Sequence, residues 1–178
     1  MSSSKILVIG DSIADVYREF KYKKDCPDAP ETPVGLFERT ETRPGGAANV
    51  AANLAVLVPT NCQVDLISAL NIDTARALKF ASHNRVNVSD SLFVTDERSL
   101  RKERIIFDYA SPYDFVVRLD NRSAIDEIDR ELVQESVRKY LEKNTPDLVV
   151  LSDYAGGVLT NELLEELHAS CPDVRHET

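Results

Sequence analysis

The sequence predicts an α/β fold in three layers, with a mostly parallel sheet between two layers of helices. Two uninterrupted apolar runs, residues 6–9 and 148–151, are typical of strands buried on both faces of a parallel sheet. Between these runs, residues 124–143 place apolar side chains at helical spacing on one face. Strands that alternate with amphipathic helices favour a parallel sheet that is covered on both sides.

The segments between these runs continue the alternation of strand and helix. A helix that begins at Ala47 is expected to stop at Leu57, because Pro59 follows. Residues 71–73 form the capped start of a surface helix. The other expected elements are strands over residues 64–69, 86–88 and 91–94, the surface helix over 73–80 and a last helix over 160–168.

The C-terminal end of the sequence predicts a shortened sheet. Residues 171–175 would ordinarily lead into another parallel strand, but the sequence stops at Thr178. We therefore expect a single domain over residues 1–178 that is truncated on the C-terminal side of its sheet. Helix faces that missing strands would have covered tend to recruit a partner, so we expect a homodimer or a larger assembly.

Residues 17–43 and 100–119 differ from the core strands and predict a small β flap beside the sheet. Both stretches alternate polar and apolar residues, as half-exposed strands do. Pro27, Pro30 and Pro33 exclude regular pairing at the centre of a sheet, which favours an exposed position for this part of the flap.

Composition and charge restrict the classes of function. The 178 residues are 43% hydrophobic and 29% charged, as in a soluble globular protein. The net charge of −9 argues against nucleic acid or an anionic membrane as a general partner, and no apolar stretch is long enough to cross a bilayer. Three widely spaced cysteines without a CxxC pair, and no signal peptide, indicate a cytoplasmic protein with reduced thiols. Neither the cysteines nor the scattered histidines predict a metal site.

The stretch from Pro44 to Asn53 is the strongest candidate for a binding site. Gly45 and Gly46 precede an alanine-rich helix, where backbone without Cβ atoms lets a ligand approach the free N–H groups of the first turn. Asn49 and Asn53 lie four residues apart and share one face of that helix. A glycine turn before a tightly packed alanine helix is the alternative, and this stretch alone does not separate the two.

Acidic residues follow the first predicted strand. Asp11 and Asp15 come just beyond Ile9, and ligands of open α/β sheets bind beyond the carboxyl ends of the strands. Both carboxylates are therefore candidate ligand contacts, Asp15 before Asp11. Turn formation and helix capping are the alternative roles for aspartates in such places.

Three motifs together resemble the ribokinase-like (PfkB-type) carbohydrate kinases: GDSIAD at residues 10–15, PGGAANVAAN at 44–53 and LSDYA at 151–155. Residues 26–30 and 118–120 extend the likeness, which within this family is closest to the heptose 7-phosphate kinases of ADP-heptose synthesis. The resemblance covers nearly the whole chain. It implies a ribokinase-like fold, a sugar phosphate as ligand, and a flap that serves as a lid and as a dimer interface.

The resemblance also implies roles for individual residues. Lys102 and Arg104 match basic residues of the heptose kinases, and Arg118 suits bidentate contact with the phosphate of the sugar. For these three residues a solvated strand face is the alternative. The sugar-binding positions of the family are matched by Asp15, Gly45, Gly46, Asn49, Asn53 and Asp153.

Departures from the family limit what the resemblance implies. The kinases are almost twice as long, and their nucleotide site and Gly-Ala-Gly-Asp motif, whose aspartate is the general base, lie in the half without a counterpart here. Neither that motif nor a P-loop occurs in this sequence, so we expect no catalytic residue in it. ATP and Mg²⁺ are expected to bind only if a second half completes the site. Gly156 also stands where the heptose kinases carry a lysine.

Two functions follow from this comparison. The chain is expected to be the sugar-phosphate-binding part of a carbohydrate kinase, without independent catalysis. The alternative is a non-catalytic protein derived from such a kinase, which binds a sugar or forms dimers through the flap.

Overall fold

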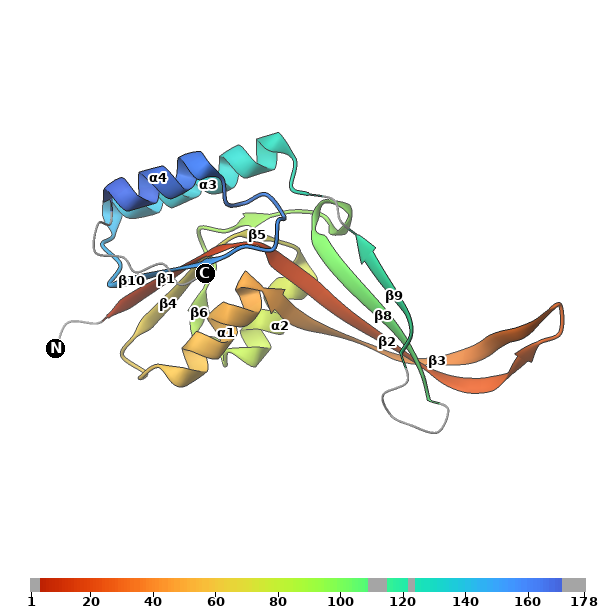
Figure 1. The fold of residues 1–178 in the computed structure, drawn as a ribbon. Helices are drawn as coiled ribbons and strands as arrows, with labels where there is room; N and C mark the ends of the chain where they lie inside the picture. The colour runs from red at the N-terminus through yellow and green to blue at the C-terminus, as the bar shows by residue number, and fades with distance from the viewer. Residues whose placement is uncertain (1–3, 109–114, 122–123, 171–178) are drawn as a thin grey trace.

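The computed structural model describes residues 4–108, 115–121 and 124–170 (Figure 1). The expected lead-in to a further strand at residues 171–175, and the link between the two later flap strands, lie outside these residues. A main sheet of four parallel strands forms the centre of the molecule. In sheet order its strands are β10 (Leu148–Ser152), β1 (Lys5–Gly10), β4 (Gln63–Ile67) and β6 (Val86–Asn87).

Helices cover both faces of the main sheet, which confirms the predicted three layers (Figure 1). Ile6 and Val8 of β1 pack on the side of α1 and α2, while Leu7 and Ile9 pack on the side of α3 and α4. This alternation follows from the two-residue period of a strand, and it explains why β1 is apolar throughout. The helices are α1 (Ala47–Leu57), α2 (Ile72–Ala81), α3 (Glu127–Lys143) and α4 (Asn161–Ser170).

The helix boundaries follow their capping residues. α1 spans the predicted residues, and Asn71 caps α2 by accepting a hydrogen bond from the Thr74 N–H at 2.8 Å. α3 begins at Glu127 rather than at residue 124, because the Asp126 side chain accepts a hydrogen bond from the Asp129 N–H and so fixes the first turn. Among the described helices, none is both long and apolar enough to cross a membrane.

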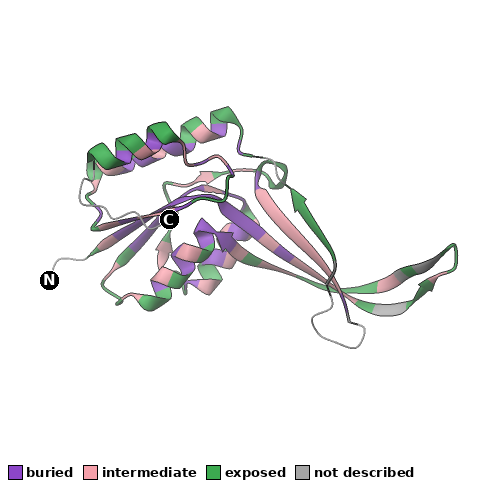
Figure 2. Cartoon of the chain, in the orientation of Figure 1, coloured by how far each residue is buried: buried purple, intermediate pink, exposed green. Residues whose placement is uncertain are grey.

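A second, mixed sheet extends away from the layers (Figure 1). Its central strands β2 and β8 run parallel, and each outer strand is antiparallel to its neighbour. Figure 2 shows that the far end of the β2–β3 hairpin is exposed. In sheet order the strands are β3 (Ala29–Gly46), β2 (Ser12–Cys26), β8 (Leu100–Asp108) and β9 (Phe115–Asn121). Three short elements connect the main sheet and the second sheet: strands β5 (Ala69–Leu70) and β7 (Leu92–Phe93), and the 3₁₀ turn η1 (Asp96–Arg98).

The second sheet extends beyond the predicted flap segments 17–43 and 100–119, since its first two strands lie within residues 12–46 and its last two within residues 100–121. β2 begins only one residue after β1, so Asp15 lies within a strand and not in the turn or helix cap considered from the sequence. It is paired with Arg43 on one side and with Lys102 on the other. The prolines are accommodated because β3 is an edge strand, and its pairing with β2 shifts register near the tip.

Asp11 joins the two sheets. Its side chain is fully buried, and its carboxylate accepts hydrogen bonds from the backbone N–H groups of Tyr154, Gly156 and Val158 at 2.9, 2.9 and 3.0 Å. Its backbone carbonyl accepts a hydrogen bond from the Ala47 N–H at 2.9 Å, at the start of α1. Asp11 therefore has the structural role that the sequence left open, and it holds the loop after β10 and the start of α1 at the end of β1.

A second buried carboxylate lies within the main sheet. Asp65 of β4 accepts hydrogen bonds from the Tyr140 hydroxyl at 2.6 Å, from Asn87 at 2.7 Å and from Gln63 at 2.8 Å. Burial, and then the hydrogen bond to Asp65, raise the pKa of Tyr140 well above its ordinary value. This network ties α3 to the sheet.

We predict that Asp11→Asn lowers the free energy of unfolding by about 2 to 4 kcal/mol, because an amide presents its own donors to three buried N–H groups. Urea unfolding monitored by circular dichroism measures this loss. The control is Asp153→Asn, since the Asp153 carboxylate is exposed and accepts one local bond, from the Ala155 N–H. Equal losses for the two variants would contradict the anchoring role of Asp11.

Tyr140→Phe is expected to lower the free energy of unfolding by about 1 to 2 kcal/mol at neutral pH, because a buried carboxylate loses one donor. The raised pKa means that this stabilisation is complete below the ordinary tyrosine value of about 10 and is lost as the pH rises through the folded-state value. A pH titration that follows tyrosine absorbance should show one tyrosine in the wild type that ionises at higher pH than the others. This component should be absent from Tyr140→Phe. Its persistence in the variant would show that another tyrosine is responsible.

Candidate functional site

The two glycines before α1 are required by close packing within the chain. Gly46 has a φ of 57°, and a Cβ atom there would lie 2.1 Å from the Asp11 carbonyl oxygen. At Gly45 a Cβ atom would lie 2.9 Å from Oδ2 of Asp15. The glycines thus allow the start of α1 to lie close to Asp11 and to Asp15 of β2. Contact between these glycines and a ligand stays a prediction.

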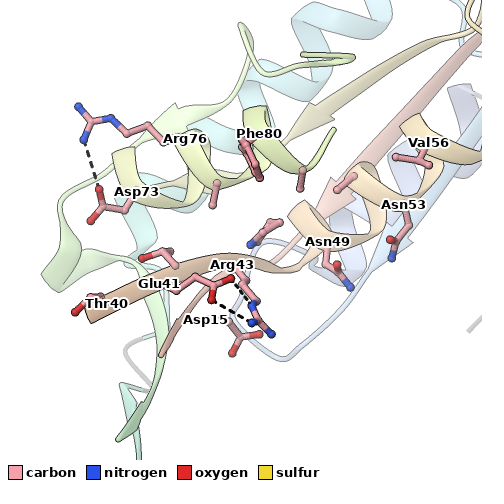
Figure 3. A pocket seen from close by; sticks show the side chains of 15 residues that line it. Asp15, Thr40, Glu41, Arg43, Asn49, Asn53, Val56, Asp73, Arg76 and Phe80 are labelled. Atoms are coloured by element: carbon pink, nitrogen blue, oxygen red, sulfur yellow. Dashed lines mark hydrogen bonds and ion pairs between the residues drawn. The ribbon is translucent and has the colours of Figure 1, made fainter. Parts of the chain in front are cut away.

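An open pocket of about 920 Å³ lies beside this helix start (Figure 3). Three of the predicted site residues line it: Asp15 from β2, and Asn49 and Asn53 from α1. Asn49 and Asn53 are both exposed, on the one helix face that their spacing predicted. Carboxylate and amide groups at this pocket can accept and donate hydrogen bonds to the hydroxyl groups of a sugar.

Arg43 and Glu41 also line the pocket and were not predicted. The Arg43 guanidinium binds the Glu41 carboxylate with two hydrogen bonds of 2.8 and 3.1 Å, drawn in Figure 3, and lies 4.4 Å from the Tyr17 ring centre. The hydrogen bond from Arg43 lowers the pKa of Glu41. The available signal was the two-residue spacing of these side chains, which places both on one face of a strand next to the Gly-Gly motif.

The predicted basic residues lie on the same face of the second sheet as Asp15. Strand pairing aligns Asp15 with Lys102 and Tyr17 with Arg104, and then Arg104 with Arg118 across β8 and β9. Residues aligned in neighbouring strands point to the same face, so the three cations form one row. Nη1 of Arg104 contacts Oδ1 of Asp15 at 2.5 Å.

Lys102 and Arg118 line a second pocket of about 420 Å³. Nζ of Lys102 lies 5.5 Å from the centre of the Tyr154 ring, in the loop after β10. The Arg118 guanidinium binds the Asp120 carboxylate with two hydrogen bonds of 2.7 Å, which raise the pKa of Arg118. Arg104 lines neither of these two pockets, but it contacts Asp15 of the first and is aligned with Arg118 of the second.

Asp153 does not join the other predicted residues. Its exposed carboxylate accepts a hydrogen bond from the Ala155 N–H at 2.8 Å, as in a local turn, and it lines neither of the two pockets. Gly156, three residues later, is enclosed: a Cβ atom there would lie 2.3 Å from Cδ1 of Leu100 and 2.8 Å from Cγ of Asp11. A lysine at this position would therefore require Leu100 or the loop to move.

Comparison with known proteins shows the family of the chain. Residues 3–173 match the pfkB family of carbohydrate kinases. The bifunctional protein HldE of Klebsiella pneumoniae is 37% identical over 157 residues, which are 88% of this chain and 31% of HldE. HldE of Desulfatibacillum aliphaticivorans is 33% identical over 174 residues, or 96% of this chain and 34% of that protein.

Solved structures show the same fold. A carbohydrate kinase from Agrobacterium tumefaciens has a TM-score of 0.58 at 17% identity, over 97% of this chain and 53% of the kinase. Phosphofructokinase-2 from Escherichia coli, solved in complex with potassium, has a TM-score of 0.59 at 15% identity, over 99% of this chain and 53% of the enzyme.

The chain spans about a third of the length of these curated relatives and about half of the length of the solved kinases. Within this span the three-layer fold and the relatives' sequences point to one family. Because the match extends over residues 3–173 and the relatives share a third or more of the aligned residues, the chain belongs to the pfkB family of carbohydrate kinases.

Proposed function

We propose that this chain is the sugar-phosphate-binding part of an ATP-dependent carbohydrate kinase that acts on heptose 7-phosphate in the cytoplasm. One observation carries the proposal: Asp15 shares a sheet face with the cation row, and it lines one pocket together with Asn49 and Asn53 of α1. A phosphorylated sugar presents the same two chemistries, hydroxyl groups and a dianionic phosphate. The motif likeness to heptose kinases, and the HldE relatives, support heptose 7-phosphate as the sugar phosphate.

The sugar hydroxyls would bind in the larger pocket. Asp15 would accept hydrogen bonds from them, and the amides of Asn49 and Asn53 would both donate and accept. The Asp15 carboxylate packs closely against the backbone of Gly45, where a Cβ atom would lie only 2.9 Å from Oδ2. This packing holds Asp15 in place. A group fixed in this way orients a hydroxyl with little loss of entropy on binding.

The phosphate would bind to the cation row. Lys102, Arg104 and Arg118 come from neighbouring strands, so a rigid sheet spaces their positive charges. Guanidinium groups make paired hydrogen bonds to phosphate oxygens, and an ammonium group adds a compact charge. The row therefore distinguishes a sugar phosphate from a neutral sugar.

Phosphoryl transfer needs groups beyond this sheet face. ATP would supply the phosphoryl group, with Mg²⁺ on its phosphate oxygens, and we propose that both bind only if a second half completes the site, because the 178 residues contain no P-loop or Gly-Ala-Gly-Asp motif. We therefore assign to this chain only the binding and orientation of the sugar. A binding protein without catalysis is the alternative, and ATP consumption with heptose 7-phosphate separates the two.

Asp15→Asn and Asn49→Ala are each expected to weaken heptose 7-phosphate binding about tenfold or more, because each removes hydrogen bonds to sugar hydroxyls. Isothermal titration calorimetry measures the dissociation constants. Asp147→Asn is the control for charge, since Asp147 lies at the opposite end of the parallel sheet, just before β10. Wild-type affinity in both site variants would refute this placement of the sugar.

The second sheet also supports the proposal of a homodimer through the flap. On its face opposite the cation row, apolar side chains cluster beside the Arg18–Glu103 ion pair: the Phe20 ring packs on Phe37 and Phe107 at centroid distances of 5.7 and 5.6 Å. Phe37 and Leu119 nevertheless remain 59% and 52% exposed. A second copy of this face would cover these side chains.

Phe37→Asp is expected to convert the dimer to a monomer, because it places a charge in the apolar interface. Leu36→Asp is the matched control, since Leu36 is 52% exposed but its side chain points to the other face of the same strand. Light scattering at micromolar concentration measures the mass. A monomeric wild type, or equal masses for both variants and the wild type, would exclude this interface.

A further inference from the structure

We infer that Arg104 makes recognition of the sugar depend on its phosphate group. Without ligand, the Arg104 guanidinium pairs with Asp15, the carboxylate assigned to the sugar hydroxyls. A phosphate on the ligand draws Arg104 away and leaves Asp15 free to bind the sugar. The inference rests on the proposed function and adds to it a specificity device and the residue that carries it.

The ion pair occupies the acceptor that the sugar needs. Nη1 of Arg104 lies 2.5 Å from Oδ1 of Asp15, and the two side chains are only 18% and 24% exposed. Partial burial strengthens their attraction relative to a pair in open water. A hydroxyl group that approaches Oδ1 of Asp15 must therefore compete with a guanidinium charge.

This pair is also the one best able to exchange partners. Arg43 binds Glu41, and Arg118 binds Asp120, each through two parallel hydrogen bonds. Arg104 binds Asp15 through a single contact between nitrogen and oxygen. A phosphate offers a guanidinium two oxygens and a larger charge, so the gain from exchange is greatest for Arg104.

The position of Arg118 favours a phosphate beside Arg104. Arg104 and Arg118 are aligned across the antiparallel pair of β8 and β9, and like charges directly opposite each other repel. A dianion bound between them removes this repulsion. The Arg104 guanidinium also lies 5.0 Å from the centre of the Tyr17 ring, which offers an aromatic face along which the planar group can turn.

Phosphate and hydroxyl binding are thus coupled. Binding energy from the phosphate breaks the pair with Asp15, whereas an unphosphorylated sugar has to break it alone. Coupling of this kind is reciprocal, so phosphate at its own site must strengthen the binding of a neutral sugar. Arg104 acts here as a positioning residue, through Asp15.

The test compares heptose with heptose 7-phosphate on the full chain by isothermal titration calorimetry. Arg104→Gln should weaken heptose 7-phosphate but strengthen unphosphorylated heptose by about 5-fold to 150-fold, the usual range of coupling between sites. The matched control is Arg118→Gln, because Arg118 hydrogen-bonds to Asp120 and is linked to Asp15 only by a weaker charge attraction. It should weaken heptose 7-phosphate and strengthen heptose far less than Arg104→Gln does. Thermal unfolding of each variant verifies that it is folded.

A second measurement requires no substitution. Saturating inorganic phosphate should strengthen the binding of heptose to the wild type, and this effect should vanish in Arg104→Gln. Unchanged or weaker heptose binding by Arg104→Gln, or no effect of phosphate on the wild type, overturns the inference while the proposed function stands. A wild type that binds no heptose 7-phosphate overturns both.

Discussion

The buried carboxylate of Asp11 is the interaction on which the site depends. Three backbone N–H groups of the loop after β10 converge on it, and its own carbonyl receives the first free N–H group of α1. A buried charge is tolerated only where its oxygens are hydrogen-bonded, so this arrangement fixes three chain segments at once. β2 begins at the next residue. The pocket beside Asp15 and the start of α1 are therefore positioned by a group that itself faces no ligand.

The second sheet separates two kinds of surface because strands alternate. One face places Asp15 and the cations next to the helix start, and the opposite face gathers Phe20, Phe37 and Phe107. The same strands thus provide a polar surface and a surface with an aromatic cluster without a break in the sheet. Pairing between β2 and β8 unites residues that are almost ninety positions apart in the chain, since Arg104 reaches Asp15. The proposed roles of the two faces rest on their chemistry and not on the fold alone.

Local signals in the sequence were sufficient for the layers and for most of the elements. The apolar runs identified β1 and β10, while the Gly-Gly motif and Pro59 identified the start and the end of α1. The sequence could not show that Asp15 lies in a strand. Only one residue separates the end of β1 from the start of β2, so there is no turn motif to recognise between them. The contact between Asp15 and Arg104 was missed for a different reason. Each residue was predicted separately to contact a ligand, and the register between β2 and β8 that brings them together cannot be read from local sequence. Arg43 was missed although it adjoins the Gly-Gly motif.

The short junction between the sheets has a mechanical consequence. Asp11 alone separates β1 from β2, and β2 then runs to Cys26. At a rise of about 3.3 Å per residue, Asp15 lies roughly 13 Å from this pivot and the hairpin tip roughly 50 Å from it. Any tilt of the sheet about Asp11 would displace the tip about four times as far as Asp15. A displacement of the outer end of the hairpin would therefore reach the Asp15 carboxylate at only about a quarter of its size.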